Sequence, residues 1–298
     1  MTDQPGEVPV DVPDPEMIRR IHRVIEPFHT IVYFAPERTE IYRGLGLGGA
    51  SGYFASRAAA LGPVPVQVVT ATFFNFSPDL VAAAMAGVWD STTPEAVLAA
   101  RLEVVDAALR AQLGDAVVDS DDLARAADLA RTAAIEATGY VEGRPLFAAH
   151  AALDWPTEPH LVLWHAVTLL REFRGDGHIA TLVTTGLDGL DAIVINAASR
   201  QIPEAFLRAT RGWDDQAWAR AIDLHRQTGW LAPDDTGTGA LELTPDGVEQ
   251  REAIEAATDR ASTLPWIAIG TAGIEELDGL MTPWSKKLTD AMFTQFKT

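Results

Sequence analysis

The stretch "GLDGLDAIVINAASRQIP", residues 186–203, repeats a pattern found earlier in the chain. Residues 48–65, "GGASGYFASRAAALGPVP", share its leading glycine, its paired alanines and its final proline at one offset. Further along, "GWDDQAWARAI" at residues 212–222 resembles "NFSPDLVAAAM" at residues 75–85. Matches that keep their order indicate an internal repeat, although Ala-rich helices also resemble one another by chance. We therefore predict two divergent copies of one helical unit.

A third match shows where the two copies differ in length. "TPEAV" from Thr93 corresponds to "TPDGV" from Thr244, but 3 residues separate Trp89 from Thr93 and 17 separate Arg226 from Thr244. The additional residues include "WLAP" and "ALEL" around "DDTGTG", which is typical of a β-hairpin. Helical periodicity covers most of the remaining chain. The predicted fold class is mainly α, with two divergent repeats and a β-hairpin in the second only.

The composition narrows the class of protein. Among 298 residues, 23 Lys+Arg stand against 42 Asp+Glu, and the resulting net charge of −19 repels phosphate backbones unless positive charge gathers on one face. The chain has no cysteine, so disulfides, thiolate metal sites and a cysteine nucleophile are excluded. The N-terminus lacks a signal-peptide pattern, and no unbroken apolar run approaches ~18 residues. We therefore expect a cytoplasmic protein.

Residues 216–260 resemble the recognition helix, the wing and the following helix of MarR-type winged-helix regulators. The resemblance is based on "GWL" at residues 229–231, which ends one helix, and "LTPDG" at residues 243–247, which opens the next. As a whole, the chain is similar to an uncharacterised group of actinobacterial proteins that contain a helix-turn-helix. The resemblance implies a winged-helix scaffold, with the predicted hairpin as its wing.

The wing departs from the MarR pattern at the positions expected to contact DNA. MarR-type wings usually contain an Asp-x-Arg pattern whose arginine enters the minor groove, whereas residues 234–239 contain no basic residue. The helix expected in the major groove has two arginines and three aspartates in or just before it: Arg220, Arg226, Asp214, Asp215 and Asp223. This charge balance disfavours tight binding to duplex DNA.

These signals predict five regions along the chain. They are a disordered leader (1–15), an N-terminal helical repeat (16–115), connecting helices (116–157), a C-terminal winged-helix-like repeat (158–262) and a C-terminal helical extension (263–298). Two repeats that pack through similar faces would leave a crevice between them.

A cluster of titratable residues lies near the start of the second repeat. His165 and Glu172 are expected on one face of a helix that ends near Gly175, and His178 is expected in the loop that follows. A histidine beside a carboxylate and arginines can act as an acid or a base, so His165, Glu172 and His178 are candidate catalytic residues. The alternative interpretation is a salt-bridged network at the end of a helix.

Five further residues are candidate ligand-binding residues. They are His29 and Tyr33 from the corresponding part of the first repeat, together with Trp164, Arg171 and Arg174. A metal site built from His165, Glu172 and His178 lacks a supporting motif, and we predict no metal. The sequence identifies no cofactor.

Three classes of function follow from these features. The first is a small-molecule-binding protein, of which an enzyme would be one form, using the crevice between the repeats and its His/Glu/Arg cluster. The second is a ligand-responsive, MarR-like transcription regulator that binds DNA. The third is an interaction module with an acidic surface. Under the first, we expect His29, His165, Glu172 and His178 to border one shared cavity.

Overall fold

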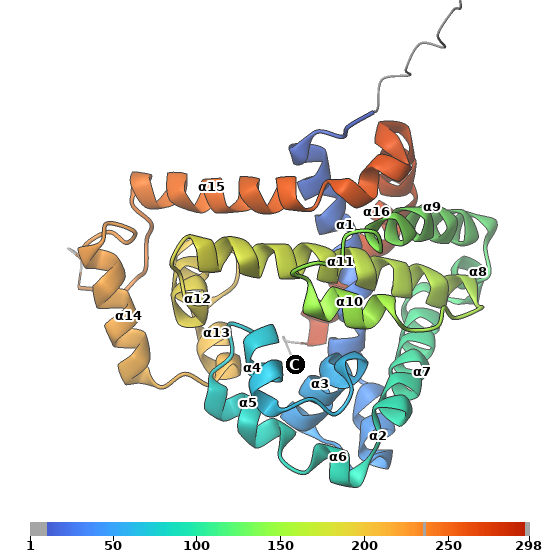
Figure 1. Cartoon of the computed structure of the whole chain (residues 1–298), viewed down its shortest axis with the longest axis horizontal. Helices are drawn as coiled ribbons and strands as arrows, with labels where there is room; N and C mark the ends of the chain where they lie inside the picture. The colour runs from blue at the N-terminus through green and yellow to red at the C-terminus, as the bar shows by residue number, and fades with distance from the viewer. Residues whose placement is uncertain (1–10, 235–236, 296–298) are drawn as a thin grey trace, which may run out of the picture.

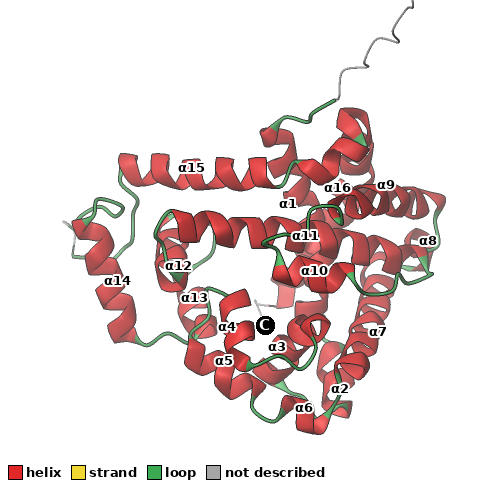
Figure 2. Ribbon diagram, viewed as in Figure 1, coloured by secondary structure: helices red, strands yellow, loops and turns green. Residues whose placement is uncertain are grey.

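Figure 1 shows the protein as a computed structural model that describes residues 11–234 and 237–295. These residues form helices joined by loops, and no β-strand occurs among them (Figure 2). The prediction of a mainly α fold is therefore confirmed.

The first half of the chain contains α1 (Pro15–Phe34), α2 (Arg38–Gly44), α3 (Gly49–Ala58), α4 (Val66–Thr72), α5 (Pro78–Met85), α6 (Val88–Ser91), α7 (Pro94–Leu113), α8 (Asp115–Val118) and α9 (Asp121–Ala137). The second half contains α10 (Pro145–Ala151), α11 (Pro159–Thr184), α12 (Gly189–Ala198), α13 (Glu204–Arg211), α14 (Asp215–Gln227), α15 (Pro245–Ala261) and α16 (Gly270–Gln295). Two 3-10 turns, at Ala59–Leu61 and Leu264–Ala268, complete the described elements.

Capping side chains start the helices at corresponding points of the two expected repeats. Ser77 and Thr93 accept backbone N–H groups at the starts of α5 and α7. Asp214 and Thr244 do the same for α14 and α15. Each cap satisfies an N–H group that has no partner inside its helix. The order α3, α4, α5, α7 thus parallels α12, α13, α14, α15, while duplication itself stays a prediction.

The long helix α11 lies at the centre of the molecule. It contacts α1, α7, α9, α10 and α15, and residues 160–170 are all buried. The main hydrophobic core surrounds its first half, and a smaller core joins α12, α13 and α14 around Trp218. No single described helix is long and apolar enough to cross a membrane, although α11 and α12, bent by 100°, pass that test as a pair.

The expected end of this helix near Gly175, with His178 in a loop, is wrong because α11 continues past both residues. A Cβ built on Gly177 would lie 2.7 Å from Nη1 of Arg144. The Arg144 guanidinium donates to backbone carbonyls of α11 and α15. The glycine at this point provides space for a neighbouring side chain and does not end the helix.

The predicted β-hairpin wing is also wrong. Its described residues form one antiparallel bridge, between Leu231 and Leu243, and residues 235–236 lie outside the described part of the chain. The carboxylate of Asp234 accepts the N–H groups of residues 238–239 at 3.2 and 2.8 Å. Backbone donors near the tip are therefore bonded to a side chain instead of extending a ladder.

The expected disordered leader falls largely on residues 1–10, which lie outside the described residues. From residue 11 the chain is attached to the C-terminal helix. The carboxylate of Asp11 accepts the N–H and the O–H of Thr271 at 2.7 and 2.9 Å. This contact places the start of α1 beside α16, which Figure 1 shows at the upper right.

The two halves of the chain contact each other at two facing turns, residues 73–77, before α5, and residues 211–214, at the end of α13 and before α14. The N–H of Ser77 donates to the carbonyl of Arg211 at 2.9 Å. The indole N–H of Trp213 donates to the carbonyl of Asn75 at 3.1 Å. In Figure 1, α5 and α13 lie next to each other at this junction.

Gly189, the first residue of α12, lies against the loop between α4 and α5. A Cβ built at this position would be 1.8 Å from the carbonyl oxygen of Phe74. Because backbone must move to accept it, we expect Gly189→Ala to destabilise the protein by roughly 1–3 kcal/mol. Thermal unfolding followed by circular dichroism measures the change as a melting temperature several degrees lower.

Gly279→Ala is the matched control. Gly279 lies on the exposed side of α16, and a Cβ built there meets nothing within 4 Å. Alanine in a helix interior should leave the melting temperature unchanged or raise it slightly. Equal melting temperatures for the two variants would contradict the close approach at Gly189.

Candidate functional site

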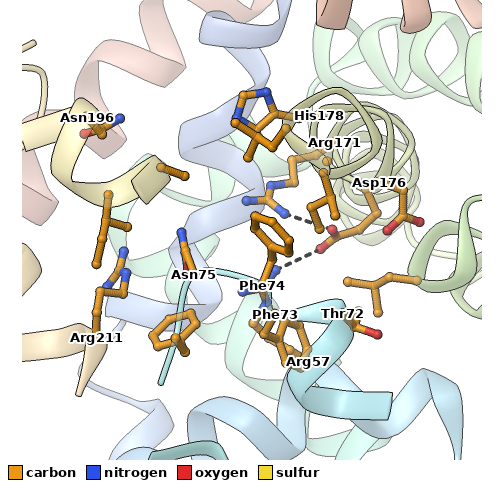
Figure 3. A pocket seen from close by; sticks show the side chains of 18 of the residues that line it. Arg57, Thr72, Phe73, Phe74, Asn75, Arg171, Asp176, His178, Asn196 and Arg211 are labelled. Atoms are coloured by element: carbon orange, nitrogen blue, oxygen red, sulfur yellow. Dashed lines mark hydrogen bonds and ion pairs between the residues drawn. The ribbon is translucent and has the colours of Figure 1, made fainter. Parts of the chain in front are cut away.

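A cavity of about 200 Å³ lies between the two regions (Figure 3). It is bounded by α3, the loop between α4 and α5, α11, α12 and α13. Its polar lining residues are Arg57, Thr72, Asn75, Arg171, Glu172, Asp176, His178, Asn196 and Arg211. Three phenylalanines, Phe73, Phe74 and Phe76, line it as well.

A buried ion network forms one wall of the cavity. Glu172 is 2% exposed, and its Oε2 accepts from Nη1 of Arg171 at 2.8 Å. Its Oε1 lies 3.6 Å from Nη2 of Arg57. Burial alone would raise the pKa of Glu172, but the two guanidinium groups outweigh burial and hold the pKa well below its ordinary value. Glu172 is therefore an ionised carboxylate that two cations already neutralise.

Arg57 reaches this network from α3. Its guanidinium carbon lies 4.4 Å from the ring centroid of Phe73, and its Nη1 donates to the hydroxyl of Tyr53 at 2.9 Å. Its Nε has no hydrogen-bond partner among the described residues. Arg57 therefore contacts Glu172 at one end and retains a buried, unused N–H group.

The opposite wall belongs to α12 and α13. Figure 3 shows Arg211 and Asn196 on the far side of the cavity from Arg171 and Asp176. The guanidinium carbon of Arg211 lies 4.6 Å from the ring centroid of Phe76, and Arg211 forms no ion pair within the described ranges. Burial lowers its pKa. Nε of Arg211 and Oδ1 of Asn196 have no partner there, which leaves one donor and one acceptor unused.

His178 lies on α11 at the top of the view in Figure 3. Its Nδ1 is 2.9 Å from Oγ1 of Thr258, whose hydroxyl donates to the carbonyl of Ile254 at 2.8 Å. Because that hydroxyl has one hydrogen, Nδ1–H of His178 must be the donor, which leaves Nε2 as an acceptor. Burial lowers the pKa of His178, so the ring is neutral at neutral pH.

The predicted site residues lie in different places. Glu172, Arg171 and His178 line the cavity. His29 lies behind Glu172, with its Nε2 3.8 Å from Oε1, and is hydrogen-bonded to the hydroxyl of Tyr33 at 3.0 Å. His29 and Tyr33 are buried and do not line the cavity, and His29 contacts Glu172 from the side away from it.

The other three predicted residues face elsewhere. Trp164 and His165 line another cavity, near the start of α11. Arg174 points toward α15, where it forms ion pairs with Asp259 at 2.7 Å and Glu255 at 3.2 Å. These ion pairs join the middle of α11 to α15, so Arg174 is not part of the local helix-end network considered from the sequence. Of that network, only the Arg171–Glu172 pair is present in the described chain.

The expectation that His29, His165, Glu172 and His178 border one cavity is wrong. His165 and Glu172 share one side of α11, but two turns separate them by about 10 Å along the helix axis. Different helices cover α11 at the two levels, so one helix face contributes to two cavities. In the described part of the chain, no group of three or more His, Asp or Glu side chains is placed to hold a metal ion.

Sequence reasoning missed Arg57, Asp176, Asn196 and Arg211. For Arg57 a signal existed, since a lone arginine within "ASRAAA" would be placed on an apolar helix. For Arg211 and Asn196 no signal existed, because what distinguishes them is the lack of a partner in three dimensions.

Asp176 provides a prediction about pH. It is buried, and its Oδ2 accepts the N–H of Phe147 at 2.9 Å. Burial raises its pKa from 3.8 to about 6. The folded protein therefore binds a proton more tightly than the unfolded chain, so this group destabilises the fold above pH 6, and the penalty disappears as the pH falls from 6 toward 4.

Asp176→Asn keeps a carbonyl acceptor for Phe147 and removes the buried charge. We expect this substitution to increase the free energy of unfolding at pH 7.5 by roughly 1–3 kcal/mol, which raises the melting temperature. The increase should become smaller as the pH falls toward 4.5. Melting curves of both proteins across this range give the difference directly. A difference that does not change with pH would show that Asp176 does not titrate near 6.

A family model described as a helix-turn-helix family matches residues 18–295. No curated protein and no solved structure matches the chain. The relation to MarR-type regulators and to actinobacterial proteins stays a prediction. Because the match spans nearly the whole sequence, the chain belongs to this helix-turn-helix family.

Proposed function

We propose that this helix-turn-helix protein binds a small organic anion in the cavity between its two halves, which are divergent copies of one winged-helix-like unit. This proposal rests on Arg211, a partly buried cation that lines the cavity and has no ion-pair partner in the described chain. A buried guanidinium without an anion is unfavourable, and an anionic ligand would relieve that cost.

The charges along the cavity support an anion on the α13 side. Arg57 and Arg171 share Glu172, and Nε of Arg171 also lies 3.7 Å from the carboxylate of Glu26, so each of them has an acid beside it. Arg211 has no such counter-charge, and Asn196 on the same wall offers an unused acceptor. A ligand that fits both the cation of Arg211 and the acceptor of Asn196 is an acid that also has a hydroxyl or amine donor.

An enzymatic form of this proposal assigns proton transfer to His178. Its Nε2 is an acceptor at the edge of the cavity, whereas the carboxylate of Glu172 is held by two guanidinium groups. A neutral imidazole suits a general base near neutral pH. Ligand binding does not depend on this step.

A thermal-shift titration with lactate tests the proposal. Lactate has a carboxylate for Arg211 and a hydroxyl for Asn196, and lactamide is its uncharged counterpart. We expect lactate at about 10 mM to raise the melting temperature of the wild-type protein and lactamide to have little effect. Native mass spectrometry of the purified protein would detect a tighter ligand that co-purifies.

Arg211→Gln should abolish the lactate shift and the co-purified mass. Arg200→Gln is the matched control, because Arg200 is exposed and pairs with Glu242 outside the cavity. A lactate shift or a ligand occupancy that is the same in Arg211→Gln as in the wild type would contradict the proposal.

A second candidate function is ligand-responsive DNA binding. Membership of a helix-turn-helix family supports DNA binding more directly than it supports ligand binding. The candidate recognition helices are α5 and α14. The exposed side of α14 includes Arg220 together with Asp215 and Asp223, and α5 contains Asp79 and no basic residue. The facing turns also pack on each other, next to the helix starts that usually contact bases.

Fluorescence anisotropy with labelled promoter and genomic fragments tests this candidate. At physiological salt we expect no complex with an affinity tighter than about 1 µM. A tight complex that weakens with added salt and with Arg220→Ala would establish DNA binding and make the cavity an effector site. Arg200→Ala again serves as the control for a lost surface charge.

A further inference from the structure

A second cavity, of about 260 Å³, lies between α7, the end of α10 and the first turns of α11. It shares no lining residue with the cavity between the two halves. One arginine and two histidines, all buried, line it: Arg101, His150 and His165. Its apolar walls are formed mainly by Leu98, Leu102, Leu153, Pro156 and Trp164.

Arg101 is a buried cation without an anionic partner. It is 2% exposed, its Nε and Nη2 form no hydrogen bond, and it forms no ion pair within the described chain. Its guanidinium carbon lies 4.9 Å from the ring centroid of Trp164. An aromatic face offsets part of the cost of removing a guanidinium from water, but it accepts no in-plane hydrogen bonds. Arg101 therefore has donors left for an acceptor in the cavity.

Two neutral histidines lie beside this cation. His150 and His165 are almost fully buried, and Nε2 of each has no partner among the described residues. Burial and then the charge of Arg101 lower the pKa of both, that of His165 to about 4. A neutral imidazole can donate one N–H to an oxygen. At neutral pH Arg101 is thus the sole charge in the buried part of this cavity.

We propose that this second cavity binds the carboxylate of a small monocarboxylic acid with an apolar body. The planar guanidinium of Arg101 can donate two parallel hydrogen bonds to the two oxygens of a carboxylate. His150 and His165 supply further hydrogen bonds, and Trp164 with the leucines contacts the apolar body.

Acidic residues at the rim of the cavity favour ligands with a single negative charge. Glu95 and Asp154 also line it, and both are exposed. Their negative charges repel a second charge on the ligand, which disfavours phosphate and dicarboxylates relative to a monocarboxylate. The apolar walls disfavour small hydrated anions for a separate reason, because these would leave the leucines without contacts.

Isothermal titration calorimetry with benzoate, benzamide and inorganic phosphate tests the proposal. We expect the wild-type protein to bind benzoate at this site at least about tenfold more tightly than either benzamide or phosphate. Arg101→Met should weaken benzoate binding by at least about tenfold. It should still fold, because it removes an unpaired charge and leaves no orphaned partner. Arg211→Gln, in the other cavity, should leave benzoate binding unchanged.

Arg101→Lys is a second variant that tests the proposal even if Arg101→Met does not fold. It retains the charge but loses the planar pair of donors, so benzoate binding should again weaken. Unchanged benzoate affinity in the Arg101 variants would overturn the proposal, as would equal affinity for benzamide or tighter binding of phosphate. Loss of benzoate binding in Arg211→Gln alone would also overturn it and would place the acid between the two halves.

Discussion

The buried ion network of Arg57, Glu172 and Arg171 is the interaction on which the arrangement of this molecule depends. Glu172 belongs to α11, the helix that contacts α1 and α7 of the first half and α15 of the second. Arg57 belongs to α3, so its approach to Glu172 fixes the first half against the central helix. Removal of one partner would leave a buried charge at a cost of about 3–5 kcal/mol. The network thus holds in place the wall that α12 and α13 face across the cavity.

Both arginines of this network have a carboxylate beside them. Among the described residues, two other arginines that line cavities do not. Exposed arginines can be solvated by water, but an arginine that lines a cavity and has an unpaired Nε–H lacks that compensation. Arg211 and Arg101 are such cations in the described chain, and each lines a cavity of its own. The first is bounded by α3, the loop between α4 and α5, α11, α12 and α13, and the second lies between α7, α10 and the start of α11. Their separation suits two ligands that differ in size and polarity.

The sequence was sufficient for the helices and their order, because caps such as Thr93 and Thr244 act locally. It was insufficient where a distant side chain overrode a local signal. The sequence pattern predicts a helix end near Gly175, yet α11 continues past it, and Arg144 from another segment occupies the space beside Gly177. Asp234 uses the backbone donors that a wing would need. Glu172, Arg171 and His178 could be predicted for the cavity, but Arg211 could not, because the absence of a partner is a property of the folded chain.

The facing turns before α5 and α14 belong to one covalent chain, and their contact is therefore unimolecular. Two separate subunits joined through such turns would dissociate on dilution, whereas these halves cannot. A two-fold symmetric dimer would also present each wall of its crevice twice. Here α3 and the loop between α4 and α5 supply one side, and α11, α12 and α13 supply the other, so the crevice occurs once per chain and has two unlike sides. A crevice of this kind is complete within a single chain and needs no second copy to form it.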